Sequence, residues 1–130
     1  MTTGNKQDYI NYRLAKADEA LNDAKTLFQT GSGNATVNRL YYACFYAVTA
    51  LLLNNSIETK THAGTKTQFG LNFIKTGIIP VKYGQLYTDI MDCRQLGDYG
   101  NMIDFVLEDV LPLIEPVEEF IGIIKQLIRT

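Results

Sequence analysis

The chain has 130 residues, of which 46% are hydrophobic and 20% are charged, and its formal net charge is −2. This length suffices for one hydrophobic core and is too short for two, so we expect a single domain over residues 1–130. The composition excludes a disordered chain. A protein that binds phosphates over its whole surface carries a basic excess, so any RNA or nucleotide contact must come from a local cluster.

Cysteine and histidine usage narrows the chemistry further. Cys44 and Cys93 form no Cys-x-x-Cys motif, and His62 is the only histidine, so we expect no metal site. No glycine-rich phosphate loop is present, and we expect no cofactor. The N-terminus lacks the apolar segment of a secretion signal, and the most apolar stretch, residues 40–53, is shorter than the ~20 residues of a membrane span. We therefore expect a cytoplasmic protein without membrane contact.

Two helices are predicted in the first half of the chain. Apolar residues recur every three or four positions from Ile10 to Phe28, the spacing of an amphipathic helix, and the glycine-rich segment 31–33 ends it. Asn34 is the predicted N-cap of a second helix that runs to about Asn54. This helix is apolar on nearly every face, so we expect it to lie at the centre of the fold or against a second subunit.

The middle of the chain predicts two more helices. One fits residues 62–76, and Pro80 suits the first turn of the next. Gly97 and Gly100 each weaken a helix by ~1 kcal/mol relative to alanine. The fourth helix is therefore expected to end or bend within residues 94–100.

A last amphipathic helix is predicted over about residues 106–129. Pro112 and Pro116 fall early in it, which predicts distorted first turns or a later start. No segment shows the alternating pattern of a half-buried strand. The predicted fold class is all-α, an antiparallel up-and-down bundle of four to five helices.

The candidate functional surface is the segment Arg94-Gln95-Leu96-Gly97-Asp98-Tyr99-Gly100. Arg94 and Asp98 are four residues apart and can pair on one helix face, and arginine suits bidentate phosphate binding. The phenol of Tyr99 can stack on a base or donate to a phosphate oxygen. The two glycines would leave the backbone open to a ligand. The structural alternative is a helix end with a surface ion pair and a glycine stop.

Two further residues are candidates for the same surface. Arg39 opens the aromatic helix, where it either pairs with a carboxylate such as Asp98 in the core or lines a groove. His62 is the one side chain suited to act as a general base near neutral pH. The alternative for His62 is a helix-start residue satisfied by a backbone hydrogen bond.

Four segments, taken together, resemble the HEPN family, specifically its small stand-alone prokaryotic proteins. They are Asn38-Arg39-Leu40-Tyr41-Tyr42-Ala43-Cys44-Phe45-Tyr46-Ala47, Lys60-Thr61-His62-Ala63-Gly64, Phe73-Ile74-Lys75-Thr76-Gly77-Ile78-Ile79 and Arg94-Gln95-Leu96-Gly97-Asp98-Tyr99-Gly100. The resemblance covers about residues 8–128. It implies a helical bundle that forms a homodimer, in an intracellular protein often encoded beside a nucleotidyltransferase partner in toxin–antitoxin or defence modules.

The resemblance also bears on activity. Many HEPN domains are metal-independent endoribonucleases in which an arginine is followed four to six residues later by a histidine. Here Arg94 matches the arginine, but that window holds Asp98, Tyr99 and Gly100. The resemblance therefore implies a non-catalytic or weakly catalytic module that binds RNA, a nucleotide or the nucleotidyltransferase.

The candidate binding residues are Arg94, Asp98, Tyr99, His62 and Arg39, and no catalytic residue is assigned. Two alternatives stay open. One is a divergent endoribonuclease toxin, which requires His62 to lie near Arg94 in the fold. The other is a structural adaptor that serves dimerisation.

Overall fold

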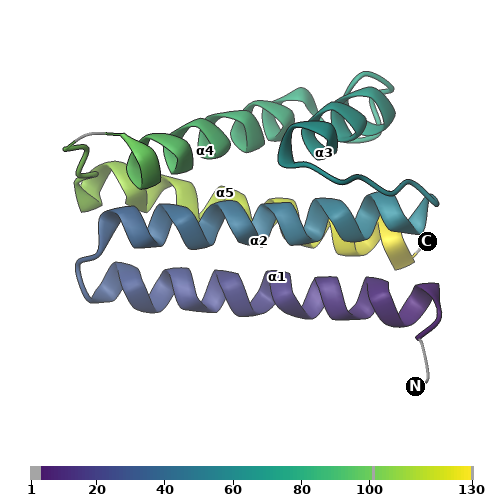
Figure 1. The fold of residues 1–130 in the computed structure, drawn as a ribbon, viewed down its shortest axis with the longest axis horizontal. Helices are drawn as coiled ribbons and strands as arrows, with labels where there is room; N and C mark the ends of the chain where they lie inside the picture. Colours follow the sequence, from purple (N-terminus) through teal and green to yellow (C-terminus); the bar gives the residue numbers. More distant parts are fainter. Residues whose placement is uncertain (1–3, 101, 130) are drawn as a thin grey trace.

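The computed structural model describes residues 4–100 and 102–129, and every regular element in these residues is helical. The elements are α1 (Lys6–Gln29), α2 (Gly33–Asn54), α3 (His62–Phe69), the short π-helical segment η1 (Gly70–Ile74), α4 (Val81–Tyr99) and α5 (Leu107–Arg129). Consecutive long helices run in opposite directions along the bundle (Figure 1). The predicted all-α, up-and-down bundle is confirmed.

Local signals fix where the helices begin and end. Asn5 and Asp8 form a reciprocal capping box at the start of α1, and Thr61 caps the N-terminus of α3. Gly31, with a φ of +86°, turns the chain after α1 in a conformation that favours glycine. α4 ends at Tyr99, within the segment where the sequence predicts its end.

The apolar α2 is the central helix, as predicted. It packs against α1, α3, α4 and α5, and the chain around it buries large aromatic side chains from several elements. Tyr41 of α2, Tyr87 of α4 and Phe120 of α5 are fully buried, and Cys44 is a core residue. None of the helices in residues 4–100 and 102–129 has an apolar stretch long enough to cross a membrane.

Two local predictions need correction. Ser32, not Asn34, precedes α2, and Asn34 lies in the first turn with its side chain directed to a segment distant in sequence. The N-cap prediction is wrong because these distant backbone groups, rather than the helix start, are the partners of the Asn34 amide. A later start of α5 is also wrong, since the helix begins at Leu107 and continues through Pro112 and Pro116.

Candidate functional site

The side chain of Tyr41 brings together two residues that the sequence places far apart. Its hydroxyl shares a hydrogen bond with Nδ1 of His62, at the start of α3. The guanidinium carbon of Arg94, on α4, lies 4.7 Å from the centroid of the Tyr41 ring. His62 and Arg94 therefore flank one buried phenol, although only the packing of α3 and α4 on α2 makes them neighbours.

Arg94 lies on the inward face of α4 and is only 6% exposed. One of its terminal nitrogens is 3.7 Å from Oδ2 of Asp98, so the pairing predicted from their four-residue spacing is confirmed as a long ion pair. Its Nε is buried and donates to no acceptor among the described residues. The rings of Tyr41 and Tyr42 supply cation–π contacts to a charge that the carboxylate only partly compensates.

Arg39 and Asp98 are connected through Asn38. The Nε of Arg39 donates to Oδ1 of Asn38 at 3.0 Å, and Nδ2 of Asn38 donates to Oδ2 of Asp98 at 2.9 Å. The guanidinium of Arg39 lies 4.9 Å from the Tyr42 ring, and that of Arg94 lies 5.8 Å from the same ring. Direct pairing of Arg39 with Asp98 was one of the two alternatives from the sequence, and this bridge replaces it. Both arginines converge on one aromatic ring.

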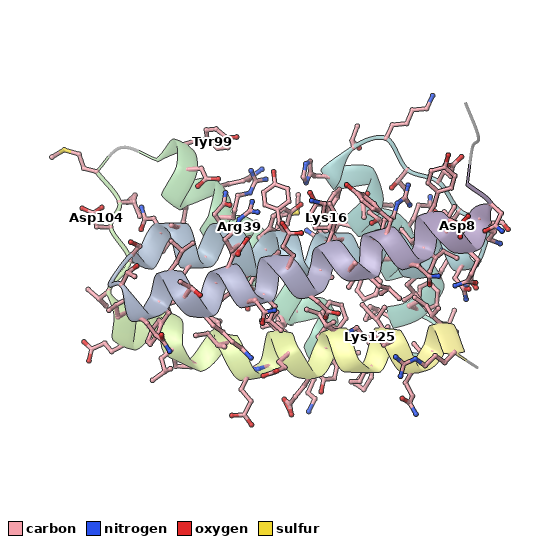
Figure 2. The ribbon with its side chains drawn as sticks, turned by 90° about the horizontal axis from the view of Figure 1, so that it is seen from below. Asp8, Lys16, Arg39, Tyr99, Asp104 and Lys125 are labelled. Carbon is pink, nitrogen blue, oxygen red and sulfur yellow. The ribbon has the colours of Figure 1, made fainter. Side chains whose placement is uncertain are left out.

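Tyr99 is the exposed member of the group. It is 76% exposed at the end of α4, and its ring centroid lies 5.8 Å from the guanidinium carbon of Arg94. Figure 2 shows Tyr99 and Arg39 on the same side of α1. All five residues predicted from the sequence are thus linked to the aromatic face of α2, which we define as Tyr41, Tyr42 and Phe45.

Gly97, in the segment before the end of α4, does not open the backbone to a ligand. A Cβ at Gly97 would lie 2.9 Å from Cε2 of Phe105, so the missing side chain makes room for that ring. Asn34 holds the same region, because its amide donates to the carbonyl oxygens of Gly97 and Ile103 and accepts from the N–H of Phe105. The interpretation of Gly97 as a ligand approach is therefore wrong.

The electrostatics leave one net positive charge at the site near neutral pH. Burial, together with the positive charge of Arg94, lowers the pKa of His62 below its ordinary value of 6.5. Burial raises the pKa of Tyr41 to about 12. Both groups are therefore neutral at pH 7, which leaves the two arginines against the single carboxylate of Asp98. In the described part of the chain, no three His, Cys, Asp or Glu side chains gather in a way that would hold a metal ion.

The sequence matches the HEPN domain family over residues 10–127. The chain belongs to this family. It is 37% identical to a protein of Thermotoga maritima named UPF0332, in an alignment that covers 95% of this chain and 94% of the relative. It is also 34% identical to a protein of Methanocaldococcus jannaschii named "putative toxin", in an alignment that covers 95% of this chain and 91% of the relative. A second protein of that organism with the same description is 30% identical, over 87% of this chain and 77% of the relative.

Sequence reasoning missed the aromatic face of α2 and two asparagines of this candidate site. Asn38 and Tyr42 connect the two arginines, and Asn34 holds the end of α4. A signal for Asn38 was available, because residues 38, 41, 42 and 45 recur at helical spacing and share one face of α2. No local signal identified Asn34, since its three partners lie more than 60 residues away in the sequence.

Proposed function

We propose that this HEPN domain binds a phosphate-bearing ligand, RNA or a nucleotide, at the aromatic face of α2 and the end of α4. One observation carries the proposal: two guanidinium groups converge on Tyr42 with one carboxylate between them, in a chain whose overall charge is −2. Guanidinium groups are preferred partners of phosphate oxygens, and local positive charge of this kind attracts an anion.

The residues contribute in different ways. Arg39 is partly exposed and can contact a phosphate directly, while Tyr99 offers a largely exposed ring for stacking on a base. Arg94 is buried under the aromatic rings, so it adds positive potential from below. Since that arginine is not open to a scissile phosphate, the proposal includes weak or absent catalysis.

Binding of a 5′-labelled single-stranded RNA, followed by fluorescence anisotropy over a salt series, tests this proposal. We expect Arg39→Gln to weaken binding about tenfold, equivalent to ~1.4 kcal/mol, and to make the affinity less dependent on salt. Arg129→Gln is the matched control, because Arg129 is exposed at the C-terminal end of α5, and α4 and α5 end at opposite ends of the bundle (Figure 1). Equal affinities of the two variants would contradict the proposal.

The contact between His62 and Tyr41 favours a second function, that of a metal-independent endoribonuclease. His62 is neutral near pH 7, so it can accept the proton of a ribose 2′-hydroxyl. The buried Arg94 would favour the negative charge that develops on the phosphate through its positive potential, without direct contact. Incubation with tRNA and mRNA tests this, beside His62→Ala and Arg94→Ala. Cleavage that both variants retain at the wild-type rate rules out this pair as the catalytic groups.

A further inference from the structure

A groove between α1, α2 and the segment after α2 is rich in aromatic side chains. Its volume is about 340 Å³, within the range of small-ligand pockets. Tyr9 and Tyr12 are 48% and 62% exposed there, so their rings are available for contact. Residues of α1 and α2 that line it are Tyr9, Tyr12, Arg13, Phe45, Tyr46 and Thr49.

This groove is continuous with the candidate site. Phe45 belongs to both, since it lines the groove and stacks on His62 with ring centroids 4.3 Å apart. The ring of Tyr46 lies 6.1 Å from that of Tyr42, on which Arg39 rests. Tyr46 lies seven positions after Arg39 on α2, or about 10 Å along the helix axis. A row of rings thus leads from the two arginines to the groove.

Positive charge accompanies the rings along this row. The guanidinium of Arg13 donates to the neutral carbonyl oxygen of Thr49 at 3.3 Å, a bond that leaves its charge uncompensated. The Nζ of Lys16 lies 5.7 Å from the Tyr12 ring and 3.5 Å from Oε2 of Glu19, so the Glu19 carboxylate offsets part of its charge. Figure 2 shows Lys16 on the same side of α1 as Arg39 and Tyr99, with Lys125 on the other side. Aromatic rings interleaved with cations form the surface on which single-stranded nucleic acids bind, because bases stack while phosphates meet positive charge.

We propose that this groove is a nucleobase subsite, which takes an unpaired base of the RNA strand whose phosphate lies at Arg39. The inference rests on the proposed function and narrows its ligand to single-stranded RNA. In a duplex the bases are paired and stacked on one another, so they cannot enter the groove. The base would stack on Tyr12 or Tyr46, and the strand would follow α2 from Arg39 to the groove.

The test compares a labelled single-stranded RNA hexanucleotide with the same sequence in a duplex and with a nucleoside monophosphate. One nucleotide is too short to span the ~10 Å from Arg39 to Tyr46, since a stacked strand rises about 3.4 Å per nucleotide. We expect Tyr12→Ala to weaken hexanucleotide binding about tenfold and to leave monophosphate binding unchanged. Tyr12→Phe keeps the ring and should bind as the wild type does.

The outcomes separate this inference from the proposed function. If Arg39→Gln weakens hexanucleotide binding and Tyr12→Ala does not, the subsite is wrong and the phosphate site stands. If the wild type binds neither the hexanucleotide nor the monophosphate, both fall. A preference for the duplex overturns the subsite. The subsite is also overturned if light scattering gives Tyr12→Ala a different molar mass from the wild type, because the groove would then be an interface between copies of the chain.

Discussion

Asn34→Ala tests whether one side chain holds the candidate site in its observed geometry. The Asn34 amide donates to the carbonyl oxygens of Gly97 and Ile103 at 3.3 and 2.7 Å, and its oxygen accepts from the N–H of Phe105 at 2.9 Å. These bonds connect the start of α2 with the end of α4 and the segment that follows. The same end of α4 carries Asp98, so the substitution should loosen the site as well as the fold.

The magnitude follows from the exposure of each bond. The bonds to Gly97 and Phe105 are partly buried and contribute about 1 kcal/mol each to the free energy of unfolding. The bond to Ile103 is exposed, so water replaces most of it. Alanine is better than asparagine inside a helix by roughly 0.5 kcal/mol. We expect a net loss of about 1.5 kcal/mol, or a Tm about 5 °C lower for a chain of this size.

Urea unfolding followed by circular dichroism measures this loss, and amide hydrogen exchange locates it. Exchange should rise in residues 97–100 and 102–106 of Asn34→Ala and stay unchanged in the middle of α1. Asn22→Ala is the control, because Asn22 is exposed on α1 and its replacement should leave stability unchanged or slightly raised. If the two variants unfold at the same urea concentration, the reasoning about Asn34 is refuted.

Three further results are expected. Gly33→Ala should destabilise the fold by about 2 kcal/mol, because the new Cβ would lie 2.2 Å from the carbonyl oxygen of Phe105. Gly122→Ala is the control and should stabilise the fold by about 0.5–1 kcal/mol, since its Cβ would have nothing within 4 Å. Equal Tm values of the two variants would contradict this. NMR of the single imidazole should give His62 a pKa below 6.5, and Arg94→Met should raise that pKa; a wild-type value of 6.5 or more contradicts the geometry. Because the folded chain binds this proton less readily than the unfolded chain, stability should fall as the pH drops from 6.5 through the folded pKa.

The sequence by itself determined the helices and the residues worth examining. Helical periodicity is a local property, so the apolar stripe of α1 and the apolar faces of α2 could be predicted from spacing alone. The pairing of Arg94 with Asp98 followed in the same way, since residues four apart share a helix face. The glycines near the end of α4 indicated where that helix ends.

Tertiary structure alone decided how these residues meet. The burial of Arg94 and its contact with Tyr41 depend on how α4 packs on α2, and the bond between Tyr41 and His62 depends on the path of the chain into α3. Asn34 shows the same limit of sequence-based prediction. An asparagine near a helix start is predicted to be an N-cap, and only the fold shows that its partners belong to a distant backbone segment. Helix formation depends on residues close together in the sequence, whereas the charge balance of this site depends on residues that only the packing of the helices brings together.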